Sequence, residues 1–233
     1  MKRFYQDASH GEAEEGWPLK LDGKPAKTPA GKFLTSPSKL VAKAIVYEWK
    51  GQKEKVDPQS MPLTQIQTTR LDFIDGRQEE AISQILKFVN SDLILYRADK
   101  PEELKDKQER IWDPWLDWMS KQFMAHYETT TNLVAVAQDP SIQDSFEGYL
   151  RKLDLSELTV FYILTTLTKS PILTMAFLEK ECSPADLFQA TQIEEMHKAE
   201  LYGENDPEIE KAQKNLRQDI DAARVYIDLL RNI

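Results

Sequence analysis

The chain has 233 residues, of which 41% are apolar and 30% charged, a balance typical of a globular protein that buries a core. Its formal net charge of −9 and its pI near 5.0 argue against nucleic acid as the main partner. Only eight glycines occur, and the chain has neither a GxGxxG motif nor a GxxxxGK motif followed by Ser or Thr, so the usual nucleotide-binding loops are excluded. The single cysteine, Cys182, excludes internal disulfides and thiolate metal clusters.

The first 35 or so residues are expected to form β structure. Trp17, Leu19 and Leu21 alternate with polar residues, and Asp22-Gly23 is a strong hairpin signal. Phe4-Tyr5 is a candidate for a further strand at the edge of this sheet. So small a meander is stable only when it packs on something else.

A first helix should follow, with Ser36 as its N-cap and Pro37 at its first position. The two prolines of the segment 56–65 mark a linker. Residues 1–60 carry a net charge of +3 and residues 61–233 a net charge of −12, so two regions of different character are expected. The predicted fold class is α+β, mainly α: a small β-rich domain with one helix at 1–60 packs with a larger helical domain at 61–233.

Helical patterns fill the rest of the chain. Pro114 should kink or divide the helix that begins near residue 101, and Leu133 to Val136 should be a short strand or an extended connection. Lys169 and Pro171 interrupt the apolar stretch 158–178, so no membrane insertion is expected. The other predicted helices are 64–74, 78–89, 141–152, 155–168, 171–180, 184–202 and 206–232, the last with an apolar stripe of Ala212, Leu216, Ile220, Ala223, Ile227 and Leu230.

Two groups of side chains could carry chemistry. Glu194 and His197 have the Glu-x-x-His spacing of di-iron bundles, but such a site needs a second copy, and Phe123 stands three residues before His126. No metal site is therefore expected. Cys182 has acidic rather than basic neighbours, which would not activate a thiol, so no catalytic residue is assigned.

Two further segments have a structural and a functional interpretation. The three tryptophans of WDPWLDW, residues 112–118, either pack in the core or form an exposed aromatic patch for another protein. Residues 181–233 carry a net charge of −6, which is either a solvated face or an acidic rim around Tyr202.

Many short stretches, taken in order, resemble one family. The chain is similar to the assembly chaperones of the F-type ATP synthase head that hold its alpha subunit (the "ATP-twelve" family). The matching stretches are KRFY at 2–5, the run from Trp17 to Gly31, Leu40 to Gln52, MPLTQ at 61–65, SDLILYRA at 91–98, Gln108 with WDPWLDW, the Ser-Pro helix at 170–178, and the glutamate pair leading to Tyr202-Gly203.

The resemblance implies a chaperone rather than an enzyme, with no cofactor and no metal. It implies that the chain binds the free alpha subunit and shields the surface that alpha later buries against beta. Glu195 best matches the acidic residue on which the family's function depends, with Glu194 adjacent as the alternative. Lys198 stands where the family has glutamine and Tyr202 where it has tryptophan, and all four residues are candidates for partner binding.

Two other classes of function remain open. A small acid–base or metal-dependent enzyme would use Glu194, Glu195 and His197, whereas a generic scaffold would bind proteins without preference for alpha. The chain is expected to be a monomer. KRFY opens the family's domain at residue 2, which favours a bacterial cytoplasmic protein, whereas eukaryotic members of the family act in the mitochondrial matrix.

Overall fold

The computed structural model describes residues 1–134, 136–203 and 206–232, and these form two compact units. The first unit combines Met1–Gln78 with Leu155–Val160 and Asp221–Ile233, and the second combines Glu79–Asp154 with Phe161–Ile220. Helices α6 (Leu155–Thr168) and α9 (Pro207–Leu230) each contribute residues to both units. The division into separate domains at residue 60 stays a prediction.

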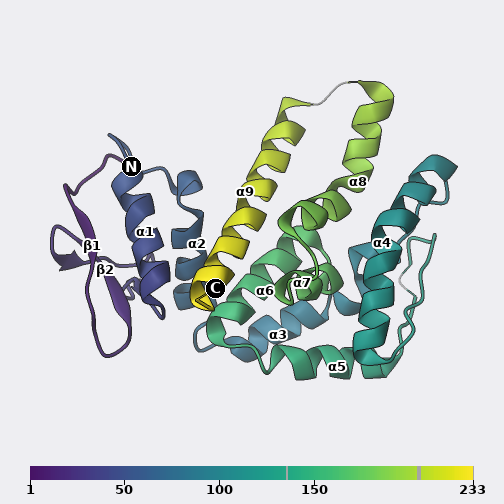
Figure 1. Ribbon diagram of the computed structural model, residues 1–233, viewed down its shortest axis with the longest axis horizontal. Helices are drawn as coiled ribbons and strands as arrows, with labels where there is room; N and C mark the ends of the chain where they lie inside the picture. Colours follow the sequence, from purple (N-terminus) through teal and green to yellow (C-terminus); the bar gives the residue numbers. More distant parts are fainter. Residues whose placement is uncertain (135, 204–205, 233) are drawn as a thin grey trace. The chain divides into compact units, whose positions relative to one another are not determined.

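The first unit contains the antiparallel sheet that the sequence predicts at the N-terminus (Figure 1). Strand β2 is central and pairs with each of the other three strands. Asp22 and Gly23 both have positive φ, at 49° and 78°, as the hairpin turn between β2 and β3 requires. The strands are β1 (Ala8–His10), β2 (Trp17–Leu21), β3 (Lys24–Pro25) and β4 (Thr35–Ser36).

Two local predictions in this region are wrong. Phe4 and Tyr5 form no strand, and β1 instead pairs with β2. Ser36 does not cap helix α1 (Lys39–Gly51), because Ser36 belongs to β4. The cap is Ser38, whose hydroxyl oxygen accepts a hydrogen bond of 3.2 Å from the backbone N–H of Leu40.

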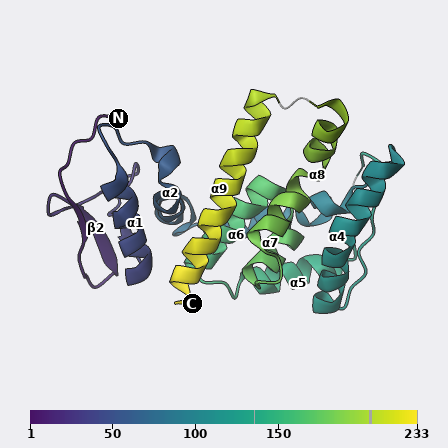
Figure 2. The ribbon, with the colours of Figure 1, turned by 45° about the horizontal axis from the view of Figure 1, so that its top comes forward.

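Helix α1 packs against β1 and β2 (Figure 2) and also supplies the cap of the next helix, α2 (Pro62–Thr69). The Glu48 carboxylate accepts hydrogen bonds of 2.7 Å from the N–H of Leu63 and 2.8 Å from that of Thr64. Burial raises the pKa of Glu48. A side chain distant in sequence thus satisfies N–H groups that α2 cannot satisfy itself.

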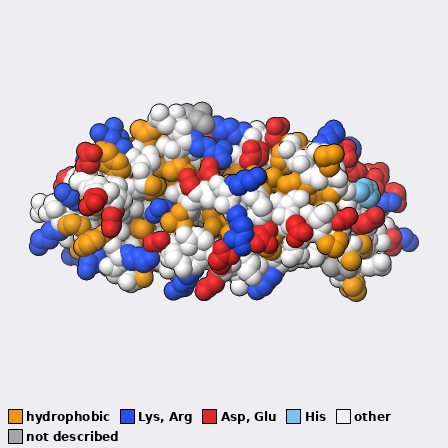
Figure 3. Space-filling view, turned by 90° about the horizontal axis from the view of Figure 1, so that it is seen from below, with side chains coloured by type: hydrophobic (Ala, Val, Ile, Leu, Met, Phe, Trp, Pro, Cys, Tyr) orange, Lys and Arg blue, Asp and Glu red, His pale blue; other side chains and the backbone are white. Residues whose placement is uncertain are grey.

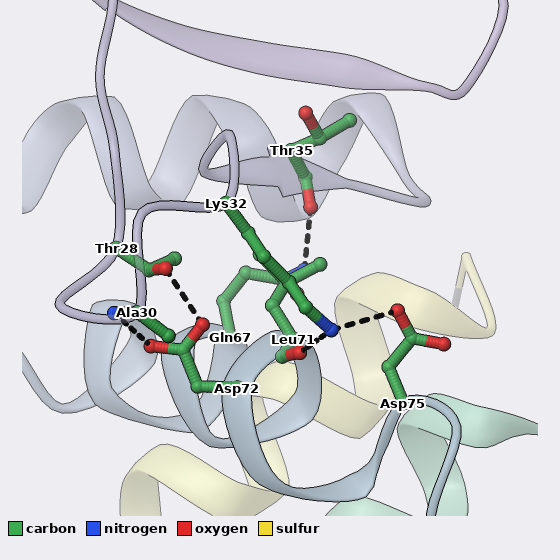
Figure 4. Close-up of polar contacts among 8 residues, drawn as sticks. All are labelled: Thr28, Ala30, Lys32, Thr35, Gln67, Leu71, Asp72 and Asp75. Atoms are coloured by element: carbon green, nitrogen blue, oxygen red, sulfur yellow. Dashed lines mark hydrogen bonds and ion pairs between the residues drawn. The ribbon is translucent and has the colours of Figure 1, made fainter.

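A single π-helical turn, η2 (Arg70–Ile74), follows α2 and holds the turn after β3 (Figure 4). The Asp72 carboxylate accepts hydrogen bonds from Thr28 Oγ1 at 2.6 Å and from the N–H of Ala30 at 3.1 Å. Lys32 Nζ forms an ion pair of 3.3 Å with Asp75. The residues between β3 and β4 are therefore fixed by polar contacts to η2 as well as by the sheet.

Gln67 links three distant segments of the first unit. It is fully buried, and its Nε2 donates a hydrogen bond of 2.6 Å to the carbonyl oxygen of Thr35. Its Oε1 accepts a hydrogen bond of 2.6 Å from the hydroxyl of Tyr226 near the end of α9. Both polar ends of a buried amide are thus satisfied within this unit.

The second unit is helical, as predicted. Helix α7 is buried along its whole length. Helix α4 continues through Pro114, so of the two effects predicted for Pro114, a kink or a division, the division is wrong. Leu133, Val134 and Val136 form no strand, and Ala135 lies outside the described residues. The helices of this unit, besides α6 and α9, are α3 (Gln78–Leu86), α4 (Glu102–Phe123), α5 (Pro140–Leu150), α7 (Pro171–Leu178) and α8 (Pro184–Tyr202), and the short 3₁₀ helices of the chain are Pro58–Ser60, Val89–Ser91 and Leu93–Leu95.

A buried carboxyl group joins two of these elements. Asp92 accepts hydrogen bonds from the N–H of Ile94 at 3.1 Å and from the N–H of Ile172, at the start of α7, at 2.9 Å. Desolvation raises the pKa of Asp92 to about 7, against the opposing effect of these hydrogen bonds. Across both units the fold is α+β, mainly α, as the sequence predicts.

Candidate functional site

Helices α4 and α8 pack together in the second unit and carry most of the candidate site residues. Trp112 of α4 is fully buried, and its Nε1 donates a hydrogen bond of 2.8 Å to the carbonyl oxygen of Ala190 in α8. The guanidinium of Arg97 lies 5.1 Å from the Trp112 ring centre and forms a 2.7 Å ion pair with Asp113. The core interpretation of the tryptophan segment therefore holds for Trp112, while Trp115 is only half-buried.

Gln108, one turn before Trp112, fixes the orientation of Glu194. The Gln108 side chain is fully buried, and its Oε1 accepts a 2.7 Å hydrogen bond from the N–H of Ala98. Its Nε2 then donates a 2.9 Å hydrogen bond to Glu194 Oε1. Glu194 is thus turned toward α4, and its carboxylate already has a partner within the unit.

Glu195 lies on a different face of α8. Glu195, Lys198 and Tyr202 follow one another at i, i+3 and i+7, which places the three side chains along one stripe of the helix. Lys198 Nζ lies 2.6 Å from Glu195 Oε1, and this hydrogen bond raises the pKa of Lys198. Tyr202 is 77% exposed at the end of the helix. The two glutamates therefore have different partners: Glu194, although exposed, accepts a hydrogen bond from Gln108, whereas the half-buried Glu195 pairs with Lys198 on the stripe that ends at Tyr202.

His197 belongs to a polar cluster on the α4 side of α8. Glu103, His197 and Glu200 offer potential metal-ligand atoms within 4.8 Å of one another. The ammonium of Lys107 lies among them, 3.3 Å from Glu103, 3.1 Å from His197 Nδ1 and 2.5 Å from Glu200. The hydrogen bond with Glu200 raises the pKa of Lys107 and lowers that of Glu200. A fixed internal cation therefore takes the position that a metal ion would need.

A shallow pocket of about 320 Å³ adjoins this cluster between α4 and α8. Ile111, Ile193 and Met196 give it an apolar surface, and Arg110 also lines it. His197 is 3% exposed, and its Nε2 has no hydrogen-bond partner among the described residues. Lys107 Nζ lies 3.1 Å from His197 Nδ1, so the two ring nitrogens of His197 have different surroundings.

The sequence alone does not indicate that Gln108, Lys107 or Glu103 belongs to this region. Gln108 appeared only as a residue of the family resemblance, with no role. The available signal was its position four residues before Trp112, which places both side chains on the same face of α4. Nothing in the sequence indicates which face of α8 meets that face of α4.

Acidic and basic side chains are interleaved on the molecular face drawn in Figure 3, with hydrophobic side chains among them. This face carries no continuous patch of positive charge of the kind that binds nucleic acid.

None of the helices in the described ranges has both the length and the apolarity needed to cross a bilayer.

Comparison with known proteins identifies the family of this chain. A family model described as "ATP12 chaperone protein" matches residues 2–120. The chain belongs to the ATP12 family. The members of this family are chaperones of ATP synthase assembly. The matched region contains the β meander, Gln108 and the tryptophan segment, while α8 with its glutamate pair lies beyond it.

Solved structures extend the similarity over nearly the whole chain. A crystal structure of Atp12 from Paracoccus denitrificans superimposes with a TM-score of 0.88 at 28% identity, covering 98% of this chain and 97% of that one. A structure from Agrobacterium tumefaciens gives a TM-score of 0.90 at 34% identity, covering 98% and 86%. The mitochondrial protein atp12 of Schizosaccharomyces pombe is 21% identical over 197 residues, which are 79% of this chain and 68% of that protein.

Proposed function

We propose that this ATP12-family protein binds the free alpha subunit of the F-type ATP synthase head. It shields the surface that alpha buries against beta until the two subunits assemble. The observation that supports this proposal best is the stripe of α8 on which Glu195 and Lys198 lie in line with a largely exposed Tyr202. An exposed aromatic beside a charged pair is a typical anchor for another protein.

Shielding follows from the physical properties of an incomplete complex. A subunit that lacks its neighbour exposes apolar surface, and such surface aggregates. A chaperone that covers this surface must also release it. Release by beta requires that the alpha–beta interface be more favourable than the alpha–chaperone interface, since a ligand shifts an equilibrium only by its differential affinity.

Glu195 is the proposed charged contact, with a basic group of alpha as its partner. In the free protein Lys198 occupies the Glu195 carboxylate at 2.6 Å, so the basic group of alpha must displace or join it. The pair is exposed enough that its own contribution to stability is small, about 0–1 kcal/mol. Lys198 therefore keeps the carboxylate in place at little cost to binding.

The remaining expectations belong to the same proposal. The chain acts as a monomer in the bacterial cytoplasm, without catalysis and without a cofactor. The Lys107 ammonium between Glu103, His197 and Glu200 argues against the metal-dependent alternative, and the Gln108 contact of Glu194 argues against a free acid–base pair with His197.

The test measures binding of purified alpha subunit to the full chain and thermal melting on the same samples. Glu195→Lys should melt like the wild type and bind alpha at least about 30-fold more weakly, because truncating one partner of a desolvated charge pair costs about 2–5 kcal/mol. Glu194→Gln is the matched control, since its amide oxygen still accepts the hydrogen bond from Gln108. Wild-type affinity in Glu195→Lys would contradict the proposal.

A further inference from the structure

Helix α9 carries one apolar stripe along its length, but the helix packing covers only part of it. Toward the C-terminus the stripe is buried at Ile220, Ala223 and Ile227. Toward the N-terminus Ile209 is 37% exposed and Ala212 is exposed as well. Leu216 lies between them and is half-buried. The apolar stripe thus continues toward the N-terminus for about two turns beyond Leu216, where coverage of the helix begins.

The last turns of α8 are uncovered in the same way. Leu201 is 53% exposed and Tyr202 77%, and Met196 is 38% exposed. In both ribbon views the C-terminal turns of α8 and the first turns of α9 lie at the same end of the second unit (Figures 1 and 2). We call these two segments, residues 195–202 and 207–216, the α8–α9 arm. Apolar side chains exposed on neighbouring segments in this way mark a candidate interaction surface.

Charged side chains border the stripe of α9 in an ordered way. Relative to Ile209, Glu208 and Glu210 project about 100° to either side, so they flank the stripe. Lys211 and Lys214 project from the opposite face of the helix. Both flanking glutamates are exposed, and neither forms an ion pair with another described residue. The apolar surface of the arm therefore has a free acidic border.

We propose that the α8–α9 arm is a docking surface for an apolar segment of the alpha subunit flanked by lysine or arginine. This inference rests on the proposed function and extends it from Glu195 to the uncovered stripe of α9. The apolar stripe matches aliphatic side chains, and Glu208 and Glu210 complement basic ones. A second copy of this chain fits poorly as the occupant, because its net charge is −9.

The experiment compares alpha binding by full-length variants of α9. The double variant Ile209→Gln/Ala212→Gln removes aliphatic surface from the arm without adding charge, and its Kd for alpha should be weaker by about tenfold or more. Val225→Gln is the matched control, because Val225 is 46% exposed on the same helix and projects from nearly the opposite side. Its Kd should equal that of the wild type.

Each outcome decides between the two proposals. If the wild type does not bind alpha, both fail. If Glu195→Lys loses binding and the α9 double variant binds like the wild type, this inference fails and the proposed function stands. If the wild type sediments as a dimer that the double variant disrupts, the occupant is a second copy and the inference is overturned.

A second measurement needs no variant and so does not depend on variant folding. Backbone amide hydrogen exchange is followed in the wild type with and without alpha. Residues 207–216 should exchange more slowly when alpha is bound, since a docked segment excludes water from the first turns of α9. Unchanged exchange in these residues, with alpha bound elsewhere, would overturn the inference.

Discussion

The Nε1–H of Trp112 and the carbonyl oxygen of Ala190 form a 2.8 Å hydrogen bond that joins the middle of α4 to the middle of α8. Ala190 lies one turn before Glu194, so this bond fixes the part of α8 from which both glutamates project. A fully buried indole has its single donor satisfied here, as burial requires. The orientation of the candidate site thus depends on a residue that never reaches the surface.

Replacement of Trp112 should therefore be far more destabilising than replacement of Trp115. Trp112→Ala leaves a large cavity and should cost about 3–5 kcal/mol of the free energy of unfolding. Trp115→Ala should cost clearly less, because Trp115 is only half-buried. Urea unfolding of the two variants checks this order. Equal losses would mean that the Trp112 site collapses around the smaller side chain.

Asp92 gives a prediction about pH. Its folded pKa of about 7 lies above the ordinary value of 3.8, so the folded state retains a proton that the unfolded state loses as the pH rises. The contribution of Asp92 to stability is therefore fully present below pH 4 and is lost between about pH 4 and pH 7. The difference between the two pKa values of Asp92 corresponds to a change in the free energy of unfolding on the order of 4 kcal/mol.

Asp92→Asn removes this titration. The free energy of unfolding of Asp92→Asn relative to the wild type should therefore rise as the pH increases from 4 to 7. Chemical unfolding at several pH values measures the difference, and Asp75→Asn, at an exposed carboxyl, is the control. A difference between Asp92→Asn and the wild type that stays flat over this range would contradict the buried, protonated Asp92.

Asp72 should stabilise the first unit through the turn after β3 (Figure 4). Asp72→Ala leaves Thr28 Oγ1 and the N–H of Ala30 without their acceptor and should cost about 1–3 kcal/mol. Asp75→Ala removes only an exposed ion pair with Lys32 and should cost about 0–1 kcal/mol. Thermal melting of the two variants measures their loss of stability. A larger loss of stability in Asp75→Ala than in Asp72→Ala would show that the Asp72 contacts contribute little to the stability of the first unit.

Most helices and turns of the fold can be predicted from the sequence, because local residue patterns determine them. The predicted helix at 184–202 matches α8, and Asp22-Gly23 forms the predicted hairpin turn. The N-cap of α1 was misplaced because Ser36 and Ser38 both suit a cap, and only the pairing of β4 with β2 decides between them. The contact of Gln67 with Tyr226 has no local signal, since 159 residues separate the two.

The candidate site illustrates the same limit. Composition and resemblance single out Glu194 and Glu195, but not the partner that each of them has. That choice depends on how α8 is rotated against α4, and Gln108, 86 residues away, determines it by bonding to Glu194. The apolar stripe of α9 was also predicted as a whole, whereas the exposure of Ala212 follows from how far the neighbouring helices extend.

The Lys107 cluster predicts the response to metal ions. Zn²⁺ should leave the melting temperature of the wild type unchanged, because the Lys107 ammonium lies between Glu103, His197 and Glu200. Lys107→Ala removes that internal cation. Its melting temperature should fall in metal-free buffer and rise again with Zn²⁺, since a ligand that binds only the folded state stabilises it. Stabilisation of the wild type by Zn²⁺ would favour the metal-dependent alternative.

A charge exchange tests whether Glu195 acts through the partner or only through Lys198. Glu195→Lys/Lys198→Glu keeps an ion pair at i, i+3 with the charges reversed, so it should melt within about 0.5 kcal/mol of the wild type. It places the carboxylate about one turn along α8, roughly 5 Å from its original position. Binding of purified alpha should therefore remain as weak as in Glu195→Lys alone. Recovery of binding would mean that the intrahelical ion pair, rather than a carboxylate at position 195, is what alpha requires.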